Sequence, residues 1–214
     1  MEKYLQIGKS NLKHNLLPHL TIATLFLCLT PFLMGISYLD APSTARILEM
    51  YVALLGVILL TPIYLPEQNK EIRELVEAKF TSSIVVIIIR VLEAMLCMII
   101  LIGVYIILLK NNHCSFPEMK FYLGTLGEAV FLGGMGFFVY SIFDQIAVAY
   151  MLPLVYYMIN YSGRKYLKDF FLFSMSYEGY REKAYLAIVG LVLIFLGICY
   201  PYIAKRALPR LMWH

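Results

Sequence analysis

Long apolar runs, separated by short polar segments, are the feature that most constrains how this chain can fold. Several runs reach about 20 residues, the length that an α-helix needs to cross the hydrocarbon core of a bilayer. Charged residues make up only 15% of the sequence, whereas an average soluble domain carries about 25%. We therefore expect an all-α polytopic membrane protein whose spans satisfy their backbone hydrogen bonds internally.

The apolar runs predict six transmembrane helices. Their expected ranges are 19–38, 47–65, 91–109, 122–143, 146–161 and 184–204. The stretch 121–161 is too long for one span, and its polar break at Asp144 and Gln145 predicts a tight turn between two spans. Six spans leave too few residues for a soluble catalytic or nucleotide-binding domain of ordinary size. Residues 1–214 are therefore expected to form a single transmembrane domain.

Three polar segments accompany these spans. Residues 1–17 place Leu5, Leu12 and Leu16 on roughly one face, which is typical of an interfacial helix. Residues 66–83 alternate Glu and Lys or Arg around one apolar stripe, which predicts an amphipathic helix. Residues 162–183 carry several cations around an aromatic centre and predict an amphipathic segment on the outer membrane surface. The polar loop 37–46 between the first two spans is expected to be short.

The positive charges favour cytoplasmic termini in a multi-pass protein of the cell membrane. Lys3, Lys9 and Lys13 precede the first span, whereas only Arg46 follows it before the second span. Lys and Arg are enriched in cytoplasmic loops. An even number of spans then returns the C-terminus to the same side.

Glu128 is the carboxylate that the sequence places most clearly inside a span. Intramembrane carboxylates are expensive and often functional, so a proton or substrate site is one interpretation. A hydrogen bond between helices, or a side chain facing a water-filled vestibule, is the simpler one. No His lies in the middle of a span, and neither a metal-binding nor a nucleophile motif is present. The sequence predicts no catalytic residue and no bound metal.

Small residues and prolines give weaker signals within the spans. Ala129 and Gly133 form a small-xxx-small pair, which predicts close helix packing within the chain or between two copies. Pro153 could interrupt the fifth span, as in the discontinuous helices that line transport paths. Arg90 and Glu93 lie three residues apart and are expected to pair on one helical face.

The segment between the second and third spans resembles the coupling segment of the permease subunits of type-2 ABC exporters. The matching positions are Pro66-Glu67 at the opening, Glu74-Leu75, the polar turn 79–82, and Arg90 where the family usually has lysine. Phe80 stands where the family often has proline. The order of the other parts is similar over nearly the whole chain: an N-terminal amphipathic helix, six spans, a tight inner turn, and an outer segment before the last span. The first outer loop departs from the family in being very short.

The resemblance implies that this chain is the membrane subunit of an ATP-driven exporter of a small molecule, peptide or lipid. A separate cytosolic ATPase would carry ATP and Mg, so that this chain binds no cofactor itself. The resemblance places the ATPase contact at Glu67, Glu71, Glu74 and Leu75. A second permease copy, identical or related, would complete the path, and Glu128, Gly133 and Pro153 are the candidates for lining or packing it.

Two alternatives belong to other functional classes. A non-transporting membrane sensor or immunity protein would bind a peptide at residues 162–183 and need no ATPase. An intramembrane enzyme built around Glu128 is the weakest hypothesis, because the sequence shows neither a His nor a second buried acid to accompany that carboxylate.

Overall fold

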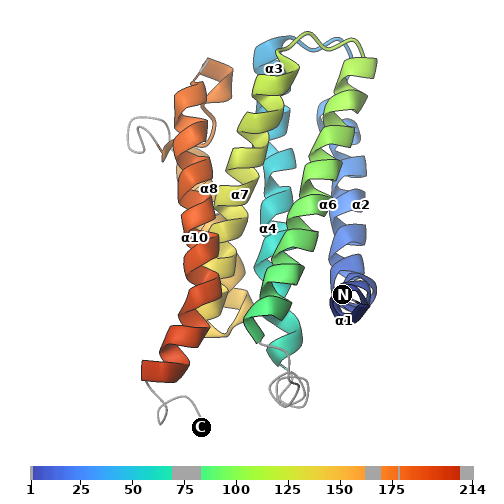
Figure 1. Ribbon diagram of the computed structural model, residues 1–214. Helices are drawn as coiled ribbons and strands as arrows, with labels where there is room; N and C mark the ends of the chain where they lie inside the picture. Colours follow the sequence, from blue (N-terminus) through green and yellow to red (C-terminus); the bar gives the residue numbers. More distant parts are fainter. Residues whose placement is uncertain (1, 69–82, 162–169, 178, 208–214) are drawn as a thin grey trace.

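The computed structural model describes residues 2–68, 83–161, 170–177 and 179–207, and these residues form helices joined by short connections, with no strand among them. The long helices run side by side along one axis (Figure 1). Five of them are long and apolar enough to cross a membrane, and α8, Ile146–Tyr161, is a shorter apolar helix. This confirms the predicted all-α fold and its general membrane character. The coupling-segment residues Glu71, Glu74 and Leu75 lie outside the described residues.

The N-terminal region is helical throughout. It consists of α1 (Glu2–Asn11), the π-helical stretch η1 (Leu12–Leu16) and α2 (Leu17–Met34). In Figure 1, α1 is seen nearly end-on at the foot of α2, so the two helices run in different directions. The first span was predicted to reach residue 38 but ends at Met34. The next residue, Gly35, adopts a positive φ of 66°, a backbone conformation that glycine accepts at little cost and that ends the helix.

The second span begins earlier than predicted, inside the segment expected to be a polar loop. It consists of α3 (Ala41–Met50), η2 (Val52–Leu54), α4 (Leu55–Leu60) and η3 (Thr61–Gln68). The Asp40 side chain caps α3 by accepting a hydrogen bond from the Ser43 amide at 3.2 Å, and a proline occupies the first turn. The same interaction with Ser43 lowers the pKa of Asp40. This early start places Glu49 inside the bundle.

The remaining helices are α6 (Ser83–Asn111), α7 (Glu118–Phe143), α8 and α10 (Tyr180–Ala207). The predicted turn at residues 144–145 is present, because α7 ends at Asp144 in a left-handed conformation and α8 begins at Ile146. Between α8 and α10 lies η5 (Met175–Tyr177). The predicted outer segment is shorter than expected, since residues 180–183 already belong to α10.

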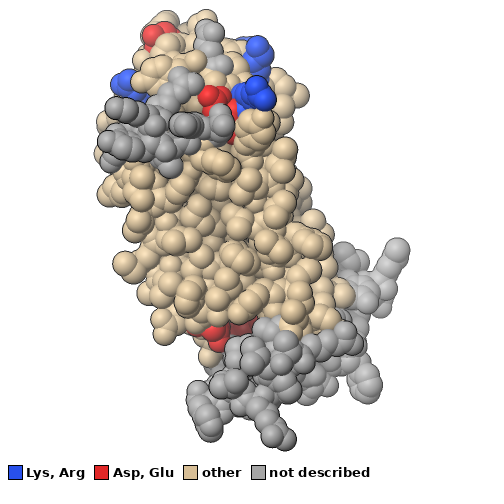
Figure 2. Space-filling model, turned by 90° about the vertical axis from the view of Figure 1, so that its left-hand side faces the viewer, with Lys and Arg blue, Asp and Glu red and all other residues tan. Residues whose placement is uncertain are grey.

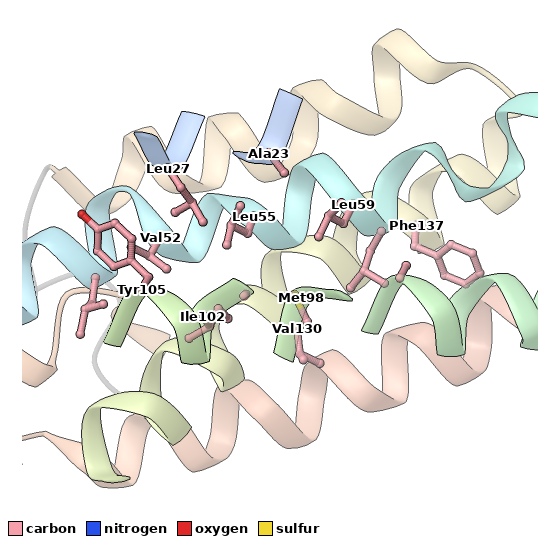
Figure 3. Packing of buried hydrophobic residues seen from close by; sticks show 14 of the residues in the cluster. Ala23, Leu27, Val52, Leu55, Leu59, Met98, Ile102, Tyr105, Val130 and Phe137 are labelled. Atoms are coloured by element: carbon pink, nitrogen blue, oxygen red, sulfur yellow. The ribbon is translucent and has the colours of Figure 1, made fainter. Parts of the chain in front are cut away.

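Helix α7 lies at the centre of the bundle, where it contacts α10, α4 and α8. The apolar core between the helices includes Leu55 and Leu59 of α4, Met98 and Ile102 of α6, and Val130 of α7 (Figure 3). Outward-facing side chains of the other helices are also apolar. Exposed examples are Leu25, Phe32, Leu92, Leu96, Met151, Met158, Leu191 and Phe195.

The viewed face of the molecule has charged side chains near its ends and a broad uncharged band between them (Figure 2). A helix that is apolar on both its inner and outer faces suits a lipid environment, because lipid-facing side chains need not be polar. The start of α1 and the end of α10 at Ala207 lie at one end of the bundle (Figure 1). We refer to this as the lower end, and to the end that carries α3 as the upper end.

Candidate functional site: a buried ionic cluster

Three charged residues from three helices meet inside the upper half of the bundle. Lys183 Nζ of α10 lies 2.8 Å from Glu49 Oε1 of α3 and 2.5 Å from Glu128 Oε2 of α7. Both glutamate side chains are fully inaccessible to solvent, and that of Lys183 is 3% exposed. Because charged groups are almost never fully buried unless they are paired, this cluster is the most unusual chemical feature in the described residues.

The cluster also binds the backbone of residues 170–177, which dip into the bundle before α10 begins. Lys183 donates a hydrogen bond to the carbonyl of Leu172. The Met175 amide donates to Glu49 Oε1 at 2.7 Å, and Ser176 Oγ donates to Glu49 Oε2 at 3.4 Å. We call residues 171–176 the plug. The ionic cluster is therefore both an interhelical contact and the anchor of the plug.

Helix α8 holds the plug from a third side. Asn160 Oδ1 accepts a hydrogen bond from the Leu172 amide at 2.8 Å, and the Asn160 side chain is buried. Tyr156 donates to the Phe170 carbonyl at 2.5 Å. Tyr157 donates to the Met50 carbonyl at 2.7 Å, where α3 ends. The Asn160 bond satisfies a backbone group that the irregular plug would otherwise leave unpaired inside an apolar bundle, and the two tyrosine bonds tie α8 to the residue before the plug and to the end of α3.

Glycines in α7 allow the neighbouring elements to approach the cluster. A Cβ added at Gly127 would lie 3.0 Å from the Lys183 carbonyl oxygen, and one at Gly124 would lie 2.5 Å from Met175 Sδ. Further along α7, Gly134 faces the backbone of α10. A Cβ added at Gly134 would lie 2.7 Å from the carbonyl oxygen of Gly190. Larger side chains at these positions would push α10 and the plug away from α7, so the glycines help to bring Lys183 to Glu128.

The structure places the predicted residues Glu128, Gly133 and Pro153 as follows. Glu128 lies in the ionic cluster, about 15 Å along α7 from its first residue. Gly133 packs directly against the backbone of Gly56 in α4, with no space for a Cβ between them. Pro153 is buried in α8, which continues as one helix from Ile146 to Tyr161, so the expected interruption is absent.

The expected pairing of Arg90 with Glu93 is wrong. Arg90 Nη1 instead lies 3.2 Å from Glu67 Oε1 and donates to the Ile63 carbonyl at 3.2 Å. Glu93 accepts a hydrogen bond from Asn11 at 2.7 Å, which ties the N-terminal helix to α6. Spacing along one helix could not reveal either partner, because both come from other elements. Glu67, which was predicted to contact an ATPase, is part-buried beside Arg90.

Sequence reasoning missed two of the three cluster residues. Glu49 lay inside the predicted second span but was not recognised as an intramembrane carboxylate, and Lys183 was assigned to the outer segment. The expectation that Glu128 has no second buried acid beside it is therefore wrong. A signal was present, because Glu49 stands among apolar residues of a predicted span in the same way that Glu128 does.

The cluster combines a cation with two carboxylates, and the described residues contain no group of three or more His, Cys, Asp and Glu arranged to hold a metal ion. Chemically, such a cluster can exchange protons and bind backbone groups. Comparisons with protein-family models, curated proteins and solved structures find no match for this chain.

Proposed function

We propose that this chain is the permease subunit of a type-2 ABC exporter, which moves a small molecule, peptide or lipid out of the cell through a path formed by two permease subunits. The observation that carries the proposal is how the elements divide between the two ends of the bundle. The lower end holds α1, the end of η3, the start of α6 and the α7–α8 turn, whereas the plug before α10 enters at the upper end. This order supports the resemblance stated from the sequence.

The Glu67–Arg90 pair adds a physical route for coupling within this proposal. The pair joins η3 to α6, which are the two elements that flank residues 69–82 in the sequence. An ATPase that moves this connection would displace both flanking helices together rather than one alone. In this proposal Glu67 secures the connection, while Glu71, Glu74 and Leu75 provide the contact with the ATPase, which carries ATP and Mg.

The first experiment is purification of the tagged full chain from its native membrane in a mild detergent, followed by identification of the copurifying proteins. We expect a stoichiometric soluble ATPase with the wild-type chain, and its loss in E71K/E74K, because charge reversal disrupts a complementary interface. E118K is a matched control, since it makes the same substitution at an exposed site at the upper end. It should retain the ATPase.

Two results would contradict the proposal. One is that the wild-type chain purifies without any ATPase in a detergent that preserves other membrane complexes. The other is an ATPase whose binding and hydrolysis rate are unchanged in E71K/E74K. The second result would remove the assigned contact even if an ATPase is present.

The sensor or immunity alternative is less well supported by the geometry. Its proposed binding surface included the aromatic centre of 162–183, but Phe171, Leu172 and Phe173 are buried against α8 and the rest of the bundle. Peptide protection that is independent of ATP hydrolysis would favour this alternative over an exporter.

A further inference from the structure

We propose that Glu128 is a proton-binding site, and that the proton bound there holds the plug in its closed position. This inference concerns the ionic cluster alone and does not depend on the proposed ATPase partner.

Lys183 lies within ion-pair distance of two carboxylates. Its Nζ donates hydrogen bonds to Glu128 Oε2 and to the Leu172 carbonyl, and it also lies 2.8 Å from Glu49 Oε1. An opposite charge within about 4–6 Å favours the charged form of an ionisable group. The geometry therefore favours Lys183 as the ammonium, which neutralises one carboxylate.

The two carboxylates differ in how many polar groups contact them. Glu49 is within bonding range of Lys183, the Met175 amide and the Ser176 hydroxyl. Glu128 accepts a hydrogen bond only from Lys183 among the described residues. Its Oε1 is buried without a hydrogen-bond partner there. Hydrogen bonds stabilise the ionised form of a carboxylate. Glu49 is thus the carboxylate better stabilised as an anion, and Glu128 is the carboxyl group that holds a proton.

No other charged group described around Glu128 compensates a second negative charge. Helix α8 contributes the neutral side chains Tyr156 and Tyr157, whose hydroxyl groups donate to backbone carbonyls. Helix α4 contributes only apolar residues and Gly56 to this contact. Two ionised glutamates beside one lysine would leave a buried net negative charge, which is strongly unfavourable.

A proton is the cation that this geometry accommodates. A metal ion requires several oxygen ligands around it, whereas the Lys183 ammonium already lies between the two carboxylates. A proton on Oε1 also needs an acceptor. Thr125 lies three residues earlier on the same face of α7, and its buried hydroxyl has no hydrogen-bond partner among the described residues. Neither of these two atoms bonds the other in this arrangement, so the bond forms only when one of the two side chains rotates.

Loss of the proton is coupled to the plug through shared atoms. Lys183 and Glu49 bind the plug backbone at Leu172 and Met175, and both also belong to the cluster. Once Glu128 ionises, the buried excess charge is relieved when water enters. Displacement of residues 171–176 opens that route at the upper end. Proton release therefore favours the open plug, and proton binding favours the closed plug.

Infrared difference spectroscopy of the purified full chain, between neutral and alkaline pH, tests the proton site directly. The wild-type spectrum should show the carbonyl stretch of one protonated carboxylic acid that disappears on alkalinisation. The band should be absent in E128Q and retained in E118Q, which changes an exposed glutamate of the same helix. Absence of the band from the wild type, or its persistence in E128Q, would overturn the assignment.

Hydrogen–deuterium exchange of the wild-type chain tests the coupling, with E128Q as a comparison. After correction for intrinsic exchange, the peptide that contains the Met175 amide should lose protection over the pH range in which the infrared band disappears. A peptide from the centre of α7 should remain protected. In E128Q, a neutral mimic of the protonated acid, the Met175 peptide should stay protected throughout. Unchanged protection of the wild-type plug across the titration would refute the coupling.

Discussion

The two ends of the bundle each contain a buried cation, but the two cations are neutralised in different ways. At the upper end Lys183 lies between two fully buried glutamates and also binds the plug backbone. At the lower end Arg90 pairs with a single glutamate, Glu67, whose side chain is 17% exposed. The upper cluster has an excess of acid and both its glutamates are fully enclosed, whereas the glutamate paired with Arg90 at the lower end is partly exposed.

This difference teaches that similar ion pairs can serve different purposes in one bundle. A pair whose carboxylate is partly exposed can form and break at a lower cost than an enclosed one, which suits a joint between two helices. An enclosed cluster with excess acid is sensitive to protonation and to any movement that admits water. Four substitutions test this difference between the two ends of the bundle, and their expected effects decrease from K183M to K110M.

The largest effect is expected for K183M. Methionine retains much of the apolar stem but removes the ammonium, so two buried carboxylates and the Leu172 carbonyl lose their shared donor. Removing one partner of a buried ionic group costs about 3–5 kcal/mol. Thermal unfolding in detergent should show a correspondingly large destabilisation. Wild-type stability would mean that the cluster is not enclosed.

The next effect is expected for G56A. A Cβ at Gly56 would clash with the backbone of Ala129, next to Glu128, and would push α4 from α7. Overpacking of this kind costs about 1–3 kcal/mol, and the upper cluster should be disturbed more than the lower pair. G103A is the control, because its added Cβ would make an ordinary 3.7 Å contact with Tyr122. Equal stability of the two variants would contradict the close packing of α4 on α7.

A smaller loss is expected for R90M at the lower end. The substitution removes the hydrogen bonds to Glu67 and Ile63, but water can solvate the remaining carboxylate. We expect a destabilisation of about 1–2 kcal/mol, between the values typical of exposed and buried pairs. The exposed Arg46 provides the matched control R46M, which should be nearly neutral. If R90M cost as much as K183M, the two ends would not differ as described.

The smallest effect is expected for K110M. Lys110 pairs with Glu118 at the surface, and the two side chains are 58% and 47% exposed. Exposed ion pairs contribute about 0–1 kcal/mol, so the unfolding temperature should barely change. This variant removes a lysine from a glutamate pair, as K183M does, and therefore separates the effect of burial from the effect of charge. A large loss in K110M would show that charge removal alone explains the K183M result.

Much of the fold could be predicted because apolar run length directly reflects helix length in a bilayer. The range predicted for the fifth span coincides with α8, and the turn at Asp144 was located from two polar residues. The start of α3 was missed, although Asp40 and the following proline form a recognisable helix-start signal. Here the polarity of the segment was given more weight than its capping pattern.

The candidate site was predicted only in part, because its partners are distant in the sequence. Glu128 was recognised from its position in an apolar run, but Lys183 lies 55 residues away from it. Glu49 and the Met175 amide are separated by 126 residues. Likewise, Arg90 had a plausible partner at Glu93 on its own helix, and the choice of Glu67 depended on how η3 packs against α6.

The helical membrane class of this protein follows from its apolar runs, since a backbone in an apolar environment must satisfy its hydrogen bonds within each helix. The positions of most helices follow from the same runs. Which polar groups meet inside the bundle depends on packing, because the close approach of α3, α7 and α10 sets those distances. That packing places one lysine between two glutamates and attaches the plug to them.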